Sequence, residues 1–384
     1  MFQRIVPFPR RGSCLLLGPR QTGKSTLVRS ILPPGSWTVD LLQHDVFLRY
    51  VKEPARFRAE ATERIRRGAP AIFVDEVQKI PALLDEVHGL IEQTRVRFFL
   101  TGSSARKLRR GGVNLLAGRA AARRLHPLTS VEIGNGFDLD RALRFGTLPA
   151  VVTADVEAAT ELLAAYAQTY LREEIQAEAV VRNLGGFARF LDVAAAQSGD
   201  ILNAVAVASD AGVSARTVRE YFQILEDTLI GFRLEPWRKS PRARLVGHPR
   251  FYFFDTGVTN ALNRRLHAEV DAPTRGRLFE QWVVTECVRL VDYLYPETRL
   301  FYWRTNHGAE VDLLFERHGK LLLAVEIKSR RSVSSADLTG LRSFAEAHPG
   351  VPRAVVATVP EPFRIDTIDV LPWRLFFAEI GDRL

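Results

Sequence analysis

Eight consecutive residues near the start of the chain have the types and spacing that phosphate binding requires. They are Gly18, Pro19, Arg20, Gln21, Thr22, Gly23, Lys24 and Ser25, and they fit the pattern G-x-x-x-x-G-K-[ST] at every position. Glycines let the backbone N–H groups of such a loop surround phosphate, at the N-terminus of the following helix. We expect Lys24 to reach the β- and γ-phosphates of a nucleotide and the Ser25 hydroxyl to ligate Mg²⁺. Thr26, the next residue, completes the predicted ATP site.

Two acids at the end of an apolar run form the second signal. Residues 71–74 are continuously apolar, which is typical of a buried parallel strand, and Asp75 and Glu76 follow directly. Ligands bind at the carboxyl ends of such strands. We expect Asp75 to hold Mg²⁺ and Glu76 to orient or deprotonate the attacking water, as in a Walker B strand. The alternative is that the two acids cap the next helix. A pair of acids favours hydrolysis over nucleotide binding alone.

Two further positions could complete this site. The apolar run 96–100 ends in polar residues, and the position resembles the sensor of AAA-type ATPases, which contacts the γ-phosphate. Ser103 is our first candidate and Thr101 the second, with an ordinary helix cap as the alternative. Arg119 is a candidate arginine finger for the site of a neighbouring subunit, which would make the protein a homo-oligomer. The alternative for Arg119 is a solvated surface side chain.

The last third of the chain holds a second group of residues that could act on phosphate. Glu326 and Lys328 are two residues apart in a predicted strand, so they share one face of it. Asp312 lies in the preceding strand of the predicted hairpin, and Glu280 lies in a predicted helix. This spacing is typical of an Mg²⁺-dependent phosphodiesterase. Asp312, Glu326 and Glu280 would bind the metal, and Lys328 would position or activate water. The alternatives are an exposed polar sheet edge and a nuclease-like fold with weak or lost activity.

The elements that must position the first site alternate along residues 1–150. Short apolar runs and amphipathic stretches follow one another, with Pro and Gly between them, which predicts a parallel α/β sheet. The predicted strands are 14–17, 36–40, 71–75, 96–101 and 121–126, and the predicted helices are 24–32, 55–67 and 81–93.

Residues 151–250 read as a helical lid followed by a winged helix-turn-helix. We expect helices over 156–176 and 187–197, and then a short helix, a turn with Gly and a Ser cap, and a longer helix to residue 225. Strands near 230–236 and 251–255 would form the wing. Arg216 and Arg219 would lie on the exposed side of the second helix and face DNA. The alternative is a lid that packs on the ATPase and never meets DNA.

Residues 251–384 are expected to form the third domain. The order read from the sequence is helix 275–292, strands 299–304, 310–316 and 321–327, helix 335–347 and strand 352–358. This αβββαβ order places the hairpin that carries Asp312, Glu326 and Lys328 in the middle of a sheet.

Composition narrows the class of protein. The chain has 384 residues and 46% hydrophobic residues, enough for two or three cores, and a formal net charge of +9 that suits an anionic partner such as DNA. No apolar run approaches the roughly 18 residues of a membrane helix, so we expect a cytoplasmic protein without a membrane partner. The two cysteines, Cys14 and Cys287, lie far apart in apolar surroundings, which indicates core residues.

Four blocks of residues resemble one known family. They are 17–25, Asp75–Pro81, Phe251–Gly257, and a final block that runs from Trp303 through 310–312 to 326–328. The chain looks like the prokaryotic AAA-type ATPases whose C-terminal domain, long described as of unknown function, resembles the PD-(D/E)xK restriction-endonuclease-like fold. The resemblance implies nucleotide hydrolysis, with ATP as the nucleotide.

These observations favour an ATP-hydrolysing protein that binds DNA and cleaves or remodels it. The first site would hydrolyse ATP with Mg²⁺, and the second would cut phosphodiester bonds with Mg²⁺. No small-molecule substrate beyond the nucleotide is expected. One alternative is a motor on DNA junctions without nuclease activity. Another is a regulatory nucleotide switch in which the nuclease-like fold is catalytically silent.

Overall fold

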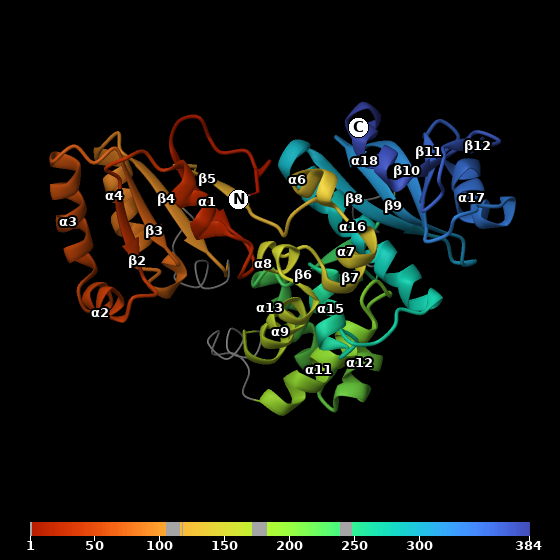
Figure 1. Cartoon of the computed structure of the whole chain (residues 1–384), viewed down its shortest axis with the longest axis horizontal. Helices are drawn as coiled ribbons and strands as arrows, with labels where there is room; N and C mark the ends of the chain where they lie inside the picture. Colours follow the sequence, from red (N-terminus) through yellow and green to blue (C-terminus); the bar gives the residue numbers. More distant parts are fainter. Residues whose placement is uncertain (1, 105–115, 117, 171–182, 239–247) are drawn as a thin grey trace.

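The computed structural model describes residues 2–104, 116, 118–170, 183–238 and 248–384. Figure 1 shows three parts: an N-terminal sheet with its helices at the left, a C-terminal sheet domain at the right, and a helical part below and between them. Within the described residues no helix is long and apolar enough to cross a membrane.

The N-terminal sheet is parallel throughout, as the sequence predicts. Its strands lie in the order β2-β3-β4-β1-β5, and each neighbouring pair is parallel. They are β2 (Trp37–Asp40), β3 (Ala71–Asp75), β4 (Arg97–Gly102), β1 (Ser13–Leu17) and β5 (Ala120–Arg124). β1 and β3 are buried along their whole length, which explains their continuous apolar sequence. The carboxyl ends of β1, β3 and β4 meet at one edge.

Helices cover both faces of this sheet. They are α1 (Lys24–Ile31), α2 (His44–Lys52), α3 (Pro54–Arg66), the short 3₁₀-helix η1 (Val77–Lys79) and α4 (Leu83–Gln93). Alternate residues of β1 enter two different cores: Leu15 packs with α3 and α4, and Cys14 and Leu16 pack on the face of Val28 from α1. Cys14 and Cys287 are both buried and free, as expected. The sequence did not predict α2.

The middle part consists of short helices, most of which surround one core, while residues of α6 and part of α7 pack with the core of the C-terminal domain. Its first helices are α6 (Ser130–Ile133), the 3₁₀-helix η2 (Gly134–Gly136), α7 (Leu139–Phe145), α8 (Pro149–Thr153), α9 (Val156–Ala165) and the π-helical turn η3 (Tyr166–Tyr170). The helix expected over 156–176 is observed to residue 170, and the rest of it lies outside the described residues. Residues 106–110, a basic cluster in the sequence, lie outside them as well.

Three further helices follow: α11 (Leu184–Ala196), α12 (Ala204–Ala211) and α13 (Ala215–Asp227). Helices α12 and α13 lie at the positions predicted for the helix-turn-helix, with Ser214 capping α13 and Gly212 in the left-handed turn at φ 64°. The wing strands β6 (Gly231–Pro236) and β7 (Arg250–Phe253) pair antiparallel. Helix α15 (Thr256–Leu262), which the sequence did not predict, packs against α7 and α11.

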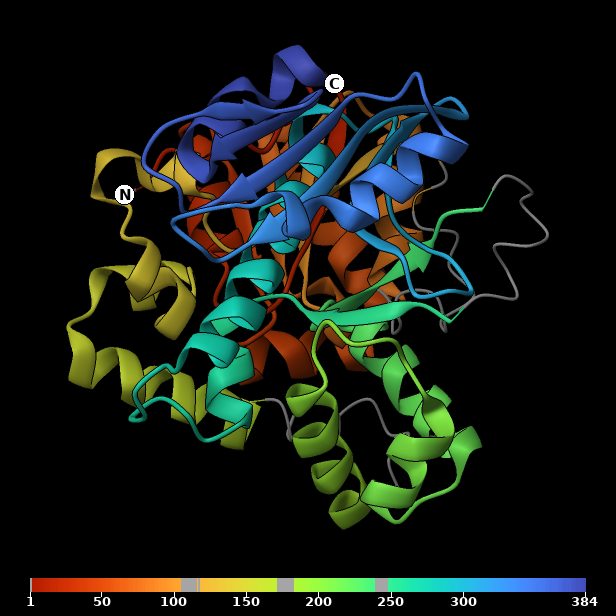
Figure 2. The same ribbon diagram turned by 90° about the vertical axis from the view of Figure 1, so that its right-hand side faces the viewer.

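The wing is also the edge of the C-terminal sheet. That sheet has the strand order β12-β13-β11-β10-β9-β8-β6-β7, and β6 runs parallel to β8. The remaining strands are β8 (Thr298–Arg304), β9 (Glu310–Arg317), β10 (Lys320–Lys328), β11 (Arg353–Ala357), β12 (Phe363–Ile365) and β13 (Ile368–Pro372). Figure 2 shows this blue sheet above the green helices of residues 184–227.

Two layers of helix enclose the C-terminal sheet. One face packs on α16 (Ala272–Leu294) and α18 (Trp373–Arg383), and the other on the 3₁₀-helix η4 (Ser335–Leu338) and α17 (Thr339–Ala347). Helix α16, β8, β9, β10, α17 and β11 follow one another in the expected αβββαβ order. Strands β12 and β13 and helix α18 extend the domain beyond that prediction.

Candidate functional site

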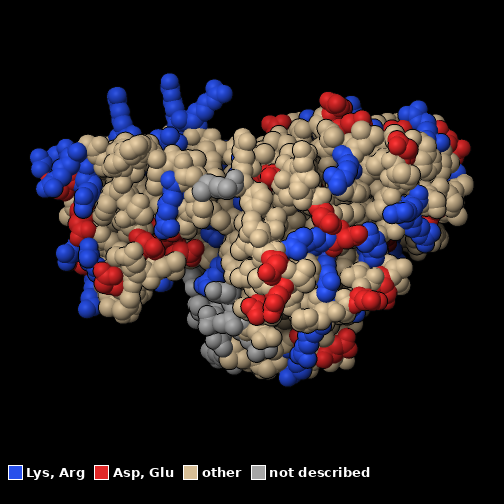
Figure 3. All heavy atoms as spheres, viewed as in Figure 1, with Lys and Arg blue, Asp and Glu red and all other residues tan. Residues whose placement is uncertain are grey.

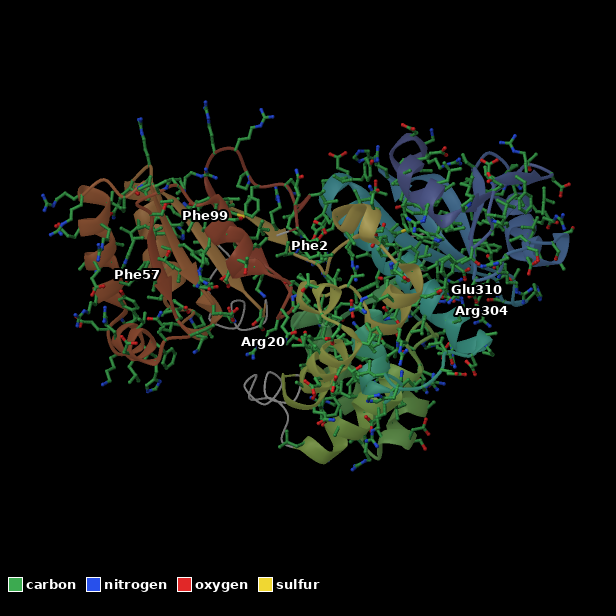
Figure 4. All side chains as sticks on the ribbon, viewed as in Figure 1. Phe2, Arg20, Phe57, Phe99, Arg304 and Glu310 are labelled. Atoms are coloured by element: carbon green, nitrogen blue, oxygen red, sulfur yellow. The ribbon has the colours of Figure 1, made fainter. Side chains whose placement is uncertain are left out.

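The phosphate loop joins β1 to α1 in a backbone that needs its glycines. Gly23 precedes α1 at φ 87°, a left-handed conformation that suits glycine. At Gly18 a Cβ atom would lie 2.3 Å from the carbonyl oxygen of Leu125, so a larger residue does not fit there. The loop therefore turns tightly against the segment that follows β5. Figure 4 labels Arg20, whose side chain lies in the space between the N-terminal domain and the helices of the middle part.

Lys24 lies folded back into the loop. Its side chain is buried, and Nζ donates to the carbonyl oxygens of Gly18 and Pro19, both at 2.8 Å. These bonds hold the ammonium group inside the loop that the sequence assigns to phosphate. Phosphate oxygens are stronger acceptors for this cation than carbonyl oxygens. The position of Lys24 therefore fits a triphosphate.

A short chain of oxygen atoms links α1 to β3 and β4. Ser25 Oγ donates to Asp75 Oδ1 at 2.7 Å, and Thr101 Oγ1 donates to the same carboxylate oxygen. Arg29 from α1 lies 3.3 Å from the other oxygen of Asp75. Burial raises the pKa of the Asp75 carboxyl. A hydroxyl and a buried carboxylate in contact are hard oxygen donors of the kind Mg²⁺ uses with a bound nucleotide, so these residues fit Mg-ATP.

Glu76 is held in place by three side chains, those of Thr101, Gln78 and Ser103. Its backbone is left-handed at φ 59°, and its N–H donates to Thr101 Oγ1 at 3.1 Å. Gln78 Nε2 donates both to a Glu76 carboxylate oxygen and, at 2.9 Å, to Ser103 Oγ. Ser103 Oγ lies 3.3 Å from the same carboxylate. The glutamate assigned to water is thus fixed at the carboxyl edge of the sheet.

The structure brings both sensor candidates to this edge. Thr101 contacts the Asp75 carboxylate and the Glu76 backbone, whereas Ser103 contacts the Glu76 side chain. The sequence analysis missed Gln78 and Arg29. Gln78 follows the acid pair by two residues, which is a local signal. Arg29 lies one helical turn after Ser25, and that spacing could have identified it.

Arg119 lies away from the phosphate loop of its own chain. It forms an ion pair with Glu92 from α4, and its side chain is 37% exposed. An exposed position is expected of an arginine finger that acts in a neighbouring subunit, and it is equally expected of an ordinary surface arginine. The role of Arg119 stays a prediction.

Arg4 connects the phosphate loop to the rest of the molecule. Its guanidinium donates to the carbonyl oxygen of Thr22 at 2.9 Å, to that of His126 at 2.7 Å and to Tyr293 Oη on α16 at 3.3 Å. It also pairs with Glu132 at 2.9 Å, and the Arg4 side chain is 6% exposed. Through Arg4, a displacement of the loop would therefore alter the contacts of α16, the long helix of the C-terminal domain.

The C-terminal residues predicted to act together do converge. Lys328 Nζ pairs with Glu326 Oε1 at 2.7 Å, and Asp312 Oδ2 accepts from the backbone N–H of Ile327 at 2.8 Å. Burial, followed by repulsion from Asp312, raises the pKa of Glu280 to about 7 and that of Glu326 to about 8. The four residues therefore form one electrostatic unit at β9, β10 and α16.

An arginine that the sequence analysis missed lies inside this unit. Arg250, the first residue of β7, lies 2.8 Å from Glu280 Oε1 and 3.6 Å from Asp312 Oδ1, and it pairs with Glu310 as well. In the described part of the chain no group of three or more His, Cys, Asp or Glu side chains is arranged to hold a metal ion. The metal ligation predicted for Glu280, Asp312 and Glu326 stays a prediction. Two of these three carboxylates, those of Glu280 and Asp312, are already in contact with Arg250.

The predicted DNA-facing residues are on the surface. Arg216 and Arg219 are exposed on α13, and Arg216 lies 3.3 Å from Glu220. Figure 3 shows blue and red side chains interspersed over most of the visible face, with several basic side chains extending from the N-terminal domain. On this face, positive charge does not gather into a single patch.

Three family models match successive parts of the chain. Residues 10–134 match the AAA domain, residues 136–269 match a domain of unknown function (DUF8612), and residues 275–376 match another domain of unknown function (DUF4143). The N-terminal sheet with its phosphate loop is therefore an AAA domain, of the class that acts as an ATPase.

Two mycobacterial proteins are similar over most of the chain. "Uncharacterized protein Rv2008c" of Mycobacterium tuberculosis (strain ATCC 25618 / H37Rv) and "Uncharacterized protein Mb2031c" of Mycobacterium bovis (strain ATCC BAA-935 / AF2122/97) are each 27% identical over 311 residues. The match covers 80% of this chain and 68% of each relative. Among solved structures, the Aeropyrum pernix ORC1 protein in complex with DNA aligns with 67% of this chain and 87% of its own, at 13% identity and a TM-score of 0.31.

Proposed function

We propose that this protein hydrolyses ATP with Mg²⁺ at the edge formed by the phosphate loop, β3 and β4. The observation that carries the proposal is the contact of Ser25 and Thr101 with the one carboxylate of Asp75. Lys24, Ser25 and the loop backbone would bind the phosphates, and Glu76 would orient the water. Bound Mg²⁺ would supply charge neutralisation at the transferred phosphoryl group.

Asp40 offers a matched control for this proposal. Asp40 lies opposite Asp75 in the β2–β3 register and also faces Arg29, at 3.6 Å, but it does not contact Ser25 or Thr101 through any hydrogen bond of the described residues. Phosphate release should fall by at least about a hundredfold in Asp75→Asn, the loss expected when charge stabilisation of the transition state is removed. Asp40→Asn should keep most of the rate. Equal rates in the two variants would contradict the proposal.

Arg119 is proposed to act in a neighbouring subunit of a homo-oligomer. Its exposed position supports this role, and a mixing experiment tests it. Arg119→Ala and Lys24→Ala should each be inactive alone. When they are mixed, some interfaces would combine an intact loop with an intact Arg119, so part of the activity should return. A mixture without recovered activity would contradict the role.

DNA processing is the second candidate function. Its support is the convergence of Asp312, Glu326 and Lys328 on adjacent strands, together with a winged helix-turn-helix whose Arg216 and Arg219 are exposed. In this proposal the winged helix binds the DNA backbone. The C-terminal site then cuts or grips the DNA with Mg²⁺, and ATP turnover drives or gates the process.

Cleavage and binding assays separate this candidate from its alternatives. Linear, single-stranded, forked and four-way-junction DNA would be incubated with Mg²⁺ or Mn²⁺, with and without ATP. Cleavage lost in Glu326→Gln but kept in Glu346→Gln, an exposed glutamate on α17, supports a nuclease. DNA-stimulated ATP turnover without cleavage supports a motor on DNA. Contacts with DNA phosphates release counterions, so the affinity of a true DNA-binding protein falls as salt is added. DNA affinity that is weak and does not change with salt therefore supports a nucleotide switch.

A further inference from the structure

The guanidinium group of Arg250 lies at the centre of three carboxylates. Glu280 comes from α16, and Glu310 and Asp312 come from β9. Arg250 Nη1 lies 2.8 Å from Glu280 Oε1 and 3.6 Å from Asp312 Oδ1, and Nη2 pairs with Glu310. The three acids thus surround one cation, supplied by β7 from the segment that joins the winged helix to the C-terminal domain.

The surroundings of Arg250 are closed and polar. Its side chain is 8% exposed, and it lies over the ring of Tyr302 with the guanidinium carbon 5.2 Å from the ring centre. Among the described residues, Arg250 Nε is buried without a hydrogen-bond partner. A cavity of about 270 Å³ opens beside the cluster, and its charged lining consists of Asp200, Glu280 and Glu310 together with Arg250, Arg277 and Arg304. Space and oxygen donors are therefore next to the guanidinium.

Three carboxylates in such a place need a cation. Removing one partner from a buried ion pair leaves an uncompensated charge, which strongly destabilises the folded protein. Carboxylate oxygens are also the ligands that Mg²⁺ and Mn²⁺ prefer. The guanidinium of Arg250 thus fills the position that a divalent cation would need. With Arg250 in place, no group of three or more His, Cys, Asp or Glu side chains among the described residues is placed to hold a metal ion.

We propose that Glu280, Glu310 and Asp312 form a divalent-cation site whose built-in occupant is Arg250, so that Mg²⁺ or Mn²⁺ binds there only when Arg250 is withdrawn. The inference rests on the proposed C-terminal function and states what keeps that site closed. Withdrawal requires β7 to shift relative to α16 and β9. Because β7 pairs with β6, which directly follows α13, movement of the winged helix is the motion that would open the site.

Binding of Mn²⁺ to the full chain tests the proposal directly. Electron paramagnetic resonance would count bound Mn²⁺ without nucleotide, in an Asp75→Asn background that removes the ATPase metal site. Arg250→Met should gain one site that is at least about tenfold tighter than any in the parent, because it frees a buried carboxylate cluster. Adding Glu280→Gln should abolish this site.

Arg304 provides the matched control. It lies 3.6 Å from Glu310 but is 46% exposed, and Figure 4 shows both side chains on the C-terminal domain. Arg304→Met removes a cation from the same carboxylate without emptying the cluster, so it should gain no Mn²⁺ site. A folded Arg250→Met protein without a new site would overturn the proposal. So would a parent protein that already binds Mn²⁺ through Glu280.

Loss of Arg250 could also prevent folding, and this outcome is informative. Recovery of a cooperative melting transition on adding Mn²⁺ to Arg250→Met, or to the hydrogen-bonding variant Arg250→Gln, supports the proposal. No recovery in either variant contradicts it.

DNA cleavage followed in the same samples separates the inference from the nuclease proposal. If Arg250→Met gains an Mn²⁺ site but does not cleave DNA, the result supports the proposed cation site and contradicts the proposed nuclease activity. If the parent protein, with Arg250 in place, cleaves DNA and Glu326→Gln does not, the result supports the nuclease activity and contradicts the proposal that Arg250 closes the site.

Discussion

Ser25 Oγ lies 2.7 Å from Asp75 Oδ1, although 50 residues separate the two in the chain. Ser25 is in the first turn of α1, and Asp75 is the last residue of β3. The contact joins the phosphate loop to the acid strand through the two oxygen atoms for which we propose Mg²⁺ binding.

Glu76→Gln should separate nucleotide binding from hydrolysis. The amide keeps the size of the side chain and its contacts with Gln78 and Ser103, but it cannot take a proton from water. Turnover should fall by about a hundredfold or more, the usual contribution of a general base, while affinity for a fluorescent ATP analogue stays near that of the parent. If turnover is unchanged, Glu76 is not the base.

The two sensor candidates should differ in their effects. Thr101→Val keeps the shape of the side chain but leaves both Asp75 and the Glu76 N–H without their hydroxyl partner. Ser103→Ala removes only a contact to the Glu76 side chain and to Gln78. Steady-state kinetics should show the larger loss of kcat in Thr101→Val. A larger loss in Ser103→Ala would instead favour the first choice made from the sequence.

The first site could be predicted from the sequence because its parts are local. The loop from Gly18 to Ser25 is contiguous, and Asp75 and Glu76 end a strand whose apolar run is plain. Both strands belong to one parallel sheet, so their ends had to meet. Arg4 could not be predicted in this way. Its contact with Tyr293 spans 289 residues, and nothing near Arg4 in sequence indicates the partner.

Arg289 should be essential for stability where the three parts meet. Its side chain is 3% exposed, lies 3.9 Å from Asp255 and 3.7 Å from Glu286, and donates to the carbonyl oxygens of Leu128 and Phe254. Arg289→Met leaves two buried carboxylates without their cation and should lower the free energy of unfolding by about 3 to 5 kcal/mol.

Urea denaturation measures this loss, with Arg216→Met as the control. Arg216 is 88% exposed, so its replacement should change the free energy of unfolding by less than about 0.5 kcal/mol. A change of similar size in both variants would show that Arg289 does not hold the parts together.

Stability should fall as pH rises through the neutral range. Burial raises the pKa of Glu280 to about 7 and of Glu326 to about 8, from an ordinary value of 4.5. The folded protein therefore binds protons that the unfolded chain releases, so the free energy of unfolding decreases between about pH 5 and pH 8. Urea titrations with EDTA would measure the slope, and Glu326→Gln should flatten it. An equal slope in the variant would contradict this assignment.

The C-terminal domain could be predicted in its order of elements but not in its pairing. The hairpin of Asp312 and Glu326 follows from alternation along two adjacent strands. The wing strands were also recognised, yet their addition to the C-terminal sheet depends on β6 lying parallel to β8, a pairing between distant segments. Arg250 reaches the acids only through that pairing. The residue types in the sequence therefore indicated a metal site, whereas the tertiary structure places Arg250 among the acids that were predicted to hold the metal.

Phosphate release by purified Lys24→Ala tests the central claim most directly. The Lys24 side chain lies inside the phosphate loop, whereas Lys52 is an exposed lysine of α2 and serves as the control. The account predicts Mg²⁺-dependent ATP turnover in the parent and in Lys52→Ala, and a loss of at least about a hundredfold in Lys24→Ala. Turnover in Lys24→Ala at the parent rate would contradict it.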